Sequence, residues 1–355
     1  MSDLNAPRKF RIKAPCSTAN IGPGFDVLGI SLSLYLTLDV EILDGSQPNT
    51  KDFEMTYSGE GANDVPLIPE KNLITKTALY VLHANSIKSL PKPLKIHVHN
   101  PIPLGRGLGS SGAAVVAGVA LGDALGQLNM GKDRMLDYCL MIERHPDNVA
   151  AALMGGFVAS YLRELDAADL EITSIPVSET FDNVTNGTGP APPQPPRGIG
   201  HFVRLGWAKE IKAIAIVPKF EVATAKARAV LPNNYERKDI VFNLQRLAVL
   251  TTALGRSPPD ADLIYNAMQD KIHQPYRKTL IPGLPDVLTS ITPQKYDGLL
   301  GICLSGAGPT ILALATHNFD TIAEEAMAVF KKVGGFDCFY EVLDVVEDGT
   351  TCTYL

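Results

Sequence analysis

The 355-residue chain has few of the features that mark secreted, membrane-spanning or nucleic-acid-binding proteins. Its five cysteines are an odd number and form no C-x-x-C pair, which is typical of a reduced, intracellular protein. No run of Lys and Arg exceeds two residues and the net charge is −6, so we expect no nucleic-acid or membrane-surface partner. The first ten residues contain no apolar signal segment, and the most apolar stretch, 298–315, holds four glycines and a proline. These absences predict a cytoplasmic globular protein.

The length and composition favour two folded domains. Hydrophobic residues make up 45% of the chain and charged residues 20%, a balance typical of globular proteins. A typical domain has about 150 residues, so this chain has room for two. The stretch rich in proline and glycine at 183–200 is the natural boundary. We expect a flexible tail at 1–8, an N-terminal domain at 9–182, a loop or linker at 183–200, and a C-terminal domain at 201–355.

The hydrophobic pattern predicts an α+β fold. Alternating apolar residues predict strands at 9–15, 34–42, 94–100, 210–218 and 337–345, and strand, turn and strand within 298–315. Helical spacing predicts helices at 72–86, 111–128, 132–143, 147–156, 224–231, 239–254 and 321–334. No helix is expected between residues 9 and 42, so the first strands should pair antiparallel.

A glycine-rich turn, PIPLGRGLGSSGAA at 101–114, follows the strand predicted at 94–100. Such turns bind phosphate because glycines let the backbone approach and a helix N-terminus attracts anions. GLGSSG also matches the dinucleotide pattern G-x-G-x-x-G, but two prolines separate the strand from Gly107 and no βαβ unit surrounds it. A Walker P-loop is excluded because no Gly-Lys-Ser/Thr follows, and protein-kinase motifs are absent. A tight turn without a ligand is the alternative.

Three segments, in order, resemble the motifs of the GHMP kinases, a family that includes galacto-, homoserine, mevalonate and phosphomevalonate kinases. They are PCSTANIGPGFDVLG (15–29), IPLGRGLGSSGA (102–113) and LSGAGPTILAL (304–314). The resemblance implies an N-terminal nucleotide-binding domain like ribosomal protein S5 and a C-terminal ferredoxin-like α+β sandwich. It also implies a small-molecule kinase that uses ATP and Mg²⁺. The residues that it places at ATP are Pro103, Leu104, Gly105, Arg106, Gly107, Leu108, Gly109, Ser110, Ser111, Gly112, Gly306 and Gly308.

The acceptor is indicated by side chains outside this loop. The segments 221–232 and 273–283 resemble those of homoserine kinases in which arginines hold the substrate carboxylate, a role that suits the planar guanidinium. Thr224 lies four residues before Arg228 on the same helix face. The segment ERHPDN (143–148) resembles their H-x-D-N region. By this resemblance, L-homoserine is held by Asn20, Asp26, His145, Asp147, Asn148, Thr224, Arg228 and Arg277, with Asp26 or Asp147 opposite its amine.

Asp26, His145 and Asn148 are the candidate catalytic residues. Asp26 could accept the hydroxyl proton or only bind the amine, while His145 and Asn148 could orient the hydroxyl. Mg²⁺ prefers one or two carboxylates with phosphate oxygens and water. The resemblance, which implies a glutamate on the helix before the histidine, makes Glu143 with Ser110 the candidate metal site, and Asp137 is the alternative carboxylate.

The expected reaction is transfer of the ATP γ-phosphoryl group to the homoserine hydroxyl, the step before threonine synthesis. A mevalonate-type kinase, a nicotinamide-dependent dehydrogenase and a non-catalytic ligand sensor remain alternatives. Asp147 also suits a purely structural N-cap for the helix predicted at 147–156. A homodimer is expected only because dimers are common.

Overall fold

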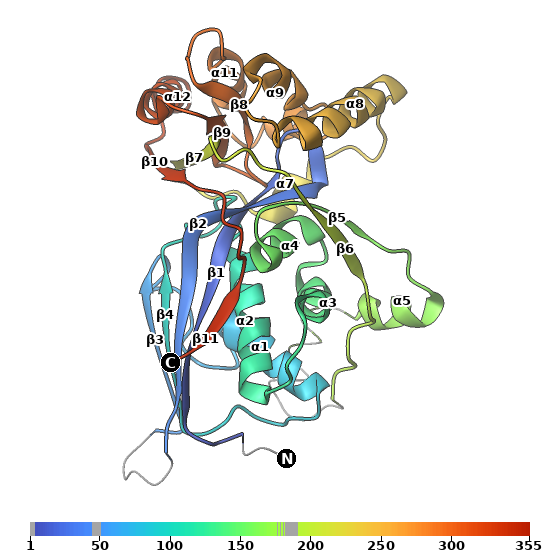
Figure 1. Cartoon of the computed structure of the whole chain (residues 1–355), viewed down its shortest axis with the longest axis vertical. Helices are drawn as coiled ribbons and strands as arrows, with labels where there is room; N and C mark the ends of the chain where they lie inside the picture. The colour runs from blue at the N-terminus through green and yellow to red at the C-terminus, as the bar shows by residue number, and fades with distance from the viewer. Residues whose placement is uncertain (1–3, 45–50, 176, 178, 180, 182–190) are drawn as a thin grey trace.

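Two β-sheets organise the chain, one in each lobe of Figure 1. The computed structural model describes residues 4–44, 51–175, 177, 179, 181 and 191–355. Among the helices formed by these residues, none is both long and apolar enough to cross a membrane.

The first sheet is built around a long antiparallel hairpin of β1 (Arg8–Asn20) and β2 (Gly24–Ile42). Its strand order is β11-β1-β2-β4-β3, and β5 and β6 continue from the other end of β2. The pair β3–β4 is parallel and the other pairs are antiparallel. The remaining strands are β3 (Phe53–Gly59), β4 (Leu94–Asn100), β5 (Phe157–Leu162), β6 (Gly200–Leu205) and β11 (Thr351–Tyr354).

Helices cover one face of this sheet and place the glycine-rich turn at its end toward the second lobe (Figure 1). They are α1 (Leu73–Ala84), α2 (Ser110–Gly126), α3 (Lys132–Glu143) and α4 (Pro146–Met154). A short helix, α5 (Ala167–Ser174), lies farther from the sheet (Figure 1). The small residues of α2 follow from its central place, because it packs against α1, α3, α4 and β1. A Cβ at Gly118 would lie 2.6 Å from the carbonyl oxygen of Ile74, so a larger residue would push α1 away.

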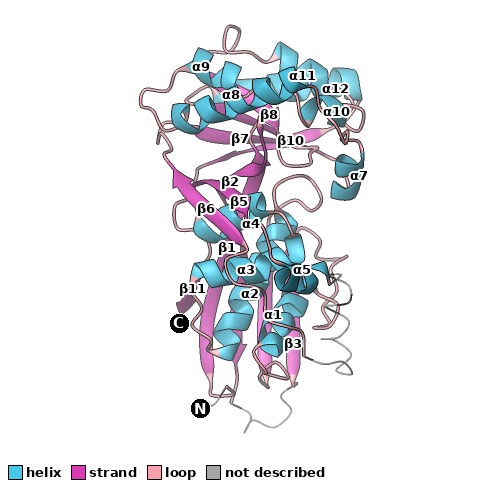
Figure 2. Ribbon diagram, turned by 90° about the vertical axis from the view of Figure 1, so that its right-hand side faces the viewer, coloured by secondary structure: helices cyan, strands magenta, loops and turns pink. Residues whose placement is uncertain are grey.

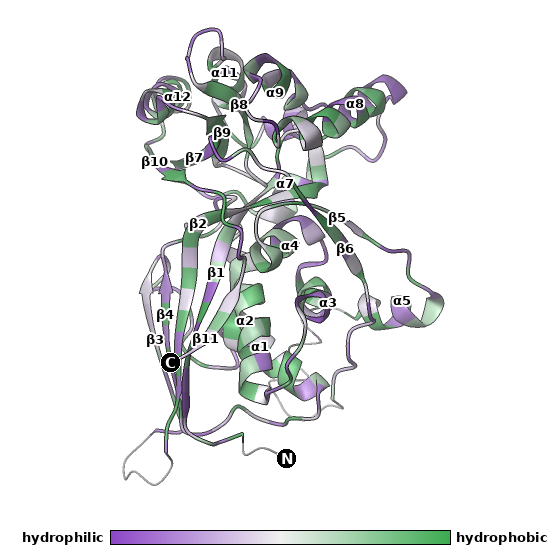
Figure 3. Ribbon diagram, in the orientation of Figure 1, coloured by the Kyte–Doolittle hydropathy of each residue, from purple (hydrophilic) through white to green (hydrophobic). Residues whose placement is uncertain are grey.

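The second sheet has the order β10-β7-β9-β8, with every pair antiparallel. Three of its strands, at 212–218, 299–304 and 311–315, are almost wholly apolar and buried, and a layer of helices lies on one side (Figures 2 and 3). Its strands are β7 (Lys212–Pro218), β8 (Leu299–Leu304), β9 (Ile311–Ala315) and β10 (Cys338–Leu343). The helices of this lobe are α7 (Thr224–Ala229), α8 (Arg237–Ala253), α9 (Ala261–Ala267), α10 (Gln274–Arg277), α11 (Leu284–Ser290) and α12 (Phe319–Gly334).

Each helix and strand predicted from the sequence is present, but two strands are much longer than predicted. β1 and β2 extend through residues 14–20 and 24–33, where burial no longer alternates because both strand faces are covered. The strands β3, β5, β6 and β11 and the helices α5, α9, α10 and α11 were not predicted. β6 and β11 belong to the first sheet, although they lie at Gly200–Leu205 and Thr351–Tyr354, in or at the edge of the predicted C-terminal domain. The predicted linker falls partly outside the described residues, and 191–199 leads as a loop into β6.

Candidate active site

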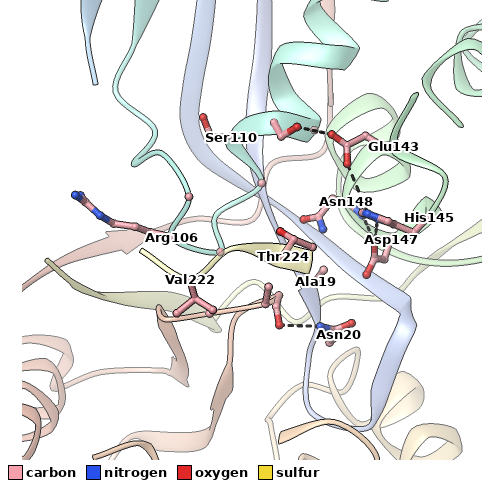
Figure 4. A pocket seen from close by; sticks show the side chains of 18 of the residues that line it. Ala19, Asn20, Arg106, Ser110, Glu143, His145, Asp147, Asn148, Val222 and Thr224 are labelled. Carbon is pink, nitrogen blue, oxygen red and sulfur yellow. Dashed lines mark hydrogen bonds and ion pairs between the residues drawn. The ribbon is translucent and has the colours of Figure 1, made fainter. Parts of the chain in front are cut away.

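A cavity of about 310 Å³ lies where the two lobes meet (Figure 4). Its lining comes from the β1–β2 turn, the glycine-rich turn, the start of α4, α7, α10 and the β8–β9 turn. The predicted residues that line it are Asn20, Asp26, Gly105, Arg106, Gly107, Gly109, Ser110, Ser111, Gly112, Glu143, His145, Asp147, Asn148, Thr224, Arg228, Arg277, Gly306 and Gly308. Pro103, Leu104 and Leu108 lie outside the lining, and Leu108 is fully buried in the hydrophobic core.

The glycine-rich turn adopts a backbone that requires glycine. Gly105, Gly107 and Gly109 have φ angles of 64°, 84° and 66°. A Cβ at Gly107 would lie 2.4 Å from the carbonyl oxygen of Ser305, and a Cβ at Gly109 would lie 2.2 Å from Oγ of Ser17. Gly109 is the N-cap of α2, so the unpaired N–H groups of the first turn of α2 open toward the cavity. This geometry suits a phosphate group.

The second lobe holds the glycine-rich turn through the β8–β9 turn. Ser305 Oγ donates to the carbonyl oxygen of Gly107 at 2.6 Å and lies 2.7 Å from Thr18 Oγ1. The N–H groups of Gly306 and Thr310 donate to carbonyl oxygens of β1 and the turn, at 3.0 and 3.2 Å. Thr18 and Ser305 were not predicted as site residues, although each lies inside a quoted family motif. Their buried hydroxyls fix the turn against both lobes.

Asn20 and Asp26 are ordered by the strained β1–β2 turn. Both have positive φ angles, 75° and 55°, which are uncommon outside glycine and cluster at functional sites. Asn20 Oδ1 accepts the N–H of Asp26 at 3.0 Å, and its Nδ2 donates to the carbonyl oxygen of Gly306 at 2.9 Å. The carboxylate of Asp26 forms a two-point ion pair with Arg228. The hydrogen bond to Asp26 raises the pKa of Arg228.

Arg277 is buried, with 2% of its surface exposed, yet its side chain reaches the cavity. Its Nε donates to the carbonyl oxygen of Ala227 at 3.2 Å. Its Nη1 donates to the carbonyl oxygen of Gly306 at 2.7 Å and lies 3.2 Å from Nδ1 of His273. Nη2 has no hydrogen-bond partner among the residues that the structure describes. Burial and the positive charge of Arg228 lower the pKa of Arg277 to about 10, so it remains a cation at neutral pH.

His145, Asp147 and Asn148 gather on one side of the cavity, and Arg106 points away from them (Figure 4). His145 Nδ1 lies 3.3 Å from Oδ1 of Asp147, and its Nε2 lies 3.6 Å from Oε2 of Glu143. Burial opposes protonation, but the hydrogen bond to Asp147 and the two carboxylate charges raise the pKa of His145 above its usual value.

The N-cap of α4 is His145, so the alternative that Asp147 is the N-cap is wrong. Asp147 lies in the first turn, and its Oδ1 accepts the N–H of Asn148 at 2.8 Å. Oδ1 of Asn148 accepts from Ser17 Oγ at 3.0 Å. This bond orients the side-chain amide of Asn148 in the cavity lining, and Ser17 was not predicted as a site residue.

The carboxylate of Glu143 lies at the first turn of α2. Ser111 Oγ donates to its Oε1 at 2.5 Å, and Ser110, the serine predicted to share a metal ion with Glu143, also lines the cavity. Asp137 is buried away from the cavity lining, where it pairs with Arg134 and accepts the N–H groups of Gly198 and Ile199. These bonds give Asp137 a structural role, so the structure does not support it as the alternative metal ligand.

Comparison with known proteins agrees with this geometry. Residues 72–156 match the family described as GHMP kinases N terminal domain. The homoserine kinase of Saccharomyces cerevisiae is 58% identical over 97% of this chain and 98% of its own length. That of Schizosaccharomyces pombe is 53% identical over 98% and 99% of the two chains. Among solved structures, the homoserine kinase from Cytophaga hutchinsonii superposes with a TM-score of 0.71 at 27% identity and covers 97% of both chains.

A mevalonate kinase from L. major, at 14% identity and a TM-score of 0.61 over 94% of both chains, shares the fold. The predicted α+β GHMP kinase fold is thereby confirmed. With full-length relatives more than half identical, the chain belongs to the homoserine kinases of the GHMP kinase family.

Proposed function

We propose that this chain transfers the γ-phosphoryl group of ATP to the hydroxyl of L-homoserine and yields O-phospho-L-homoserine and ADP. The hydroxyl oxygen bonds to the γ-phosphorus, the bond to the β,γ-bridging oxygen breaks, and the hydroxyl proton is released. The observation that carries the proposal is Arg277, a buried cation of the cavity lining whose Nη2 has no hydrogen-bond partner among the described residues. The cavity combines this cation with the carboxylate of Asp26, which suits an amino acid because its carboxylate and its amine carry opposite charges. The similar fungal proteins are homoserine kinases, which supports the same substrate.

The glycine-rich turn is the proposed site for the ATP phosphates. Phosphoryl transfer is catalysed mainly by positioning and by stabilising charge on the phosphate oxygens. The N–H groups at the start of α2 supply fixed positive dipoles without a conformational change. Ser305 holds Gly107 in place from the opposite lobe, so the turn is shaped before ATP binds.

The remaining residues suit the three polar groups of homoserine. Nη2 of Arg277 takes the carboxylate, because its other donors are already occupied. Asp26, oriented by Arg228 and Asn20, takes the amine. His145 and Asn148 orient the hydroxyl toward the glycine-rich turn. Asp26 is proposed as an amine ligand and not as the base, since both its oxygens accept from Arg228.

The first turn of α2 also fits Mg²⁺. Glu143 and a loop serine offer a carboxylate and a hydroxyl oxygen, both of which are ligands that Mg²⁺ accepts. Within the described ranges, no three His, Cys, Asp or Glu side chains are arranged to hold a metal ion, so the protein shell would be sparse. When bound, the ion would neutralise charge on the β and γ phosphate oxygens.

A panel of acceptors tests the proposal. The purified protein with Mg-ATP is offered homoserine, mevalonate, galactose or shikimate, and release of ADP is measured. We expect release above the ATP-only background with homoserine alone. ADP release with mevalonate alone would indicate a mevalonate-type kinase. No release above background with any of the four acceptors would favour a ligand sensor. A saturable change in cofactor fluorescence on titration with NADH would instead support a dehydrogenase.

A further inference from the structure

His273 lies directly behind the residue proposed to bind the homoserine carboxylate. It is the N-cap of α10, one helical turn before Arg277, and it is completely buried. It is not part of the cavity lining, so its effect on a ligand would have to pass through another residue. Two polar contacts fix its ring. Nδ1 lies 3.2 Å from Nη1 of Arg277, and Nε2 lies 2.8 Å from the carbonyl oxygen of Gly22.

These contacts decide which ring nitrogen carries the proton. A guanidinium can only donate and a carbonyl oxygen can only accept. Nδ1 must therefore present its lone pair to Arg277, and Nε2 must carry the hydrogen that Gly22 accepts. A doubly protonated ring would direct an N–H group at an N–H group of Arg277. Burial lowers the pKa of His273 and thus also favours the neutral ring.

The buried carboxylate of Asp270 does not change this assignment. Its Oδ2 is 3.6 Å from Nε2 of His273, which is longer than a hydrogen bond. Asp270 instead accepts the N–H groups of residues 272–274 and the side-chain amide of Asn243. These bonds hold the loop before α10 and leave the ring of His273 to bridge Gly22 and Arg277.

The other contacts of Arg277 show how the hydrogen bond to His273 fixes its guanidinium. Its Nε and Nη1 each donate to a backbone carbonyl oxygen. Among the described residues, His273 is the one side chain that accepts from Arg277. The ring of Phe25 stacks on His273 at 5.4 Å and lies 5.3 Å from Cζ of Arg277. Nε and Nη1 of the guanidinium are therefore fixed, and Nη2 is the nitrogen without a hydrogen-bond partner among the described residues.

We propose that His273 is a positioning residue that aims Nη2 of Arg277 at the homoserine carboxylate. Through Gly22 it also ties this arginine to the β1–β2 turn, which carries Asn20 and Asp26. The ring of His273 thus fixes Arg277, the proposed carboxylate ligand, relative to the turn that holds Asp26, the proposed amine ligand. The inference rests on the proposed function, because it requires that Arg277 binds the carboxylate.

Two substitutions separate the two hydrogen bonds of His273. In His273→Asn the side-chain oxygen can replace Nδ1 as the acceptor for Arg277, while the contact with Gly22 is lost. In His273→Gln the side-chain amide can replace Nε2 as the donor to Gly22, while Arg277 loses its acceptor. We expect His273→Gln to raise KM for homoserine about tenfold, the size of one hydrogen bond to a charged group. We expect His273→Asn to stay near the wild-type value and both variants to keep the wild-type KM for ATP.

A merely structural role gives a different result. Both variants would then have a lower unfolding temperature and a raised KM for homoserine and for ATP, to the same extent, and that pattern overturns the proposal. A wild-type KM for homoserine in His273→Gln overturns it too. If Arg277→Ala also leaves this KM unchanged, the carboxylate assignment itself has failed. If Arg277→Ala raises it and His273→Gln does not, only the role of His273 is lost.

A measurement on the unaltered protein does not depend on whether the variants fold. Imidazole ¹⁵N NMR of the complex with homoserine reports the protonation of each ring nitrogen. We expect one buried histidine, assigned by the contact of its ring with the ring of Phe25, to be neutral with its hydrogen on Nε2. A protonated ring, or a hydrogen on Nδ1, would contradict the proposal.

Discussion

Arg228 and Asp26 form a two-point ion pair across the cavity, with Nη1–Oδ2 at 3.0 Å and Nη2–Oδ1 at 2.7 Å. Their side chains are 39% and 33% exposed, so the pair adds little to the stability of the fold. The pair instead orients the side chain of Asp26, because two parallel hydrogen bonds from a guanidinium fix the plane of the carboxylate. We therefore propose that Arg228 acts on the substrate through Asp26, and that Arg277 binds the homoserine carboxylate.

A double-mutant cycle with Asp26→Asn and Arg228→Met tests this division of roles. We expect each single variant to lower kcat/KM for homoserine, and the double variant to lose little beyond Asp26→Asn alone. The coupling free energy should reach about 1 kcal/mol, within the range for residues in direct contact. Additive losses would show that Arg228 contacts the substrate independently of Asp26.

Arg277→Ala should raise KM for homoserine strongly and leave KM for ATP nearly unchanged. Loss of a buried charge partner costs about 2–5 kcal/mol, which corresponds to roughly 30-fold or more. Steady-state kinetics with each substrate varied in turn measure the effect. The matched control is Arg256→Ala, an exposed arginine of the same lobe, which should behave as wild type. Unchanged homoserine kinetics in Arg277→Ala would refute the carboxylate assignment.

The sequence predicted the parts of the site that are local in the chain. The glycine-rich turn, the ERHPDN segment and the two arginines each carry their signal within a few neighbouring residues, and the structure brings all of them to one cavity. The helices around them were predicted for the same reason, since helical periodicity is a local property.

Contacts between residues far apart in the sequence could not be predicted. Arg228 of α7 and Asp26 of β2 are 202 residues apart in sequence, so their contact depends on how the two lobes pack together. That Glu143, the last residue of α3, meets Ser111 depends on how α3 packs against the first turn of α2. β11 shows no strong alternation of its own, and it is fixed by pairing with β1 at the far end of the chain.

Gly109→Ala should impair use of ATP far more than Gly112→Ala. At Gly109 the φ angle is 66° and a Cβ would lie 2.2 Å from Oγ of Ser17, so the turn must move. At Gly112 the backbone is helical, and the nearest atom to a Cβ is 3.4 Å away, on Asn148. We expect a strong loss of kcat/KM for ATP in the first variant and a small change in the second. Equal effects would mean that the shape of the turn does not determine nucleotide binding.

Ser111→Ala should weaken the response to Mg²⁺ more than Ser110→Ala, its matched neighbour. Ser111 donates to Glu143, so its loss removes the hydroxyl oxygen from the proposed metal site and frees the carboxylate to turn away. We expect the Mg²⁺ concentration for half-maximal rate to rise about tenfold in Ser111→Ala, the lower end of effects at residues that orient metal ligands. Glu143→Gln should raise it further, and homoserine KM at saturating Mg-ATP should stay near wild type. The reverse order of the two serines would place the ion at Ser110, as the sequence predicted, and would require Glu143 to rotate when the nucleotide binds.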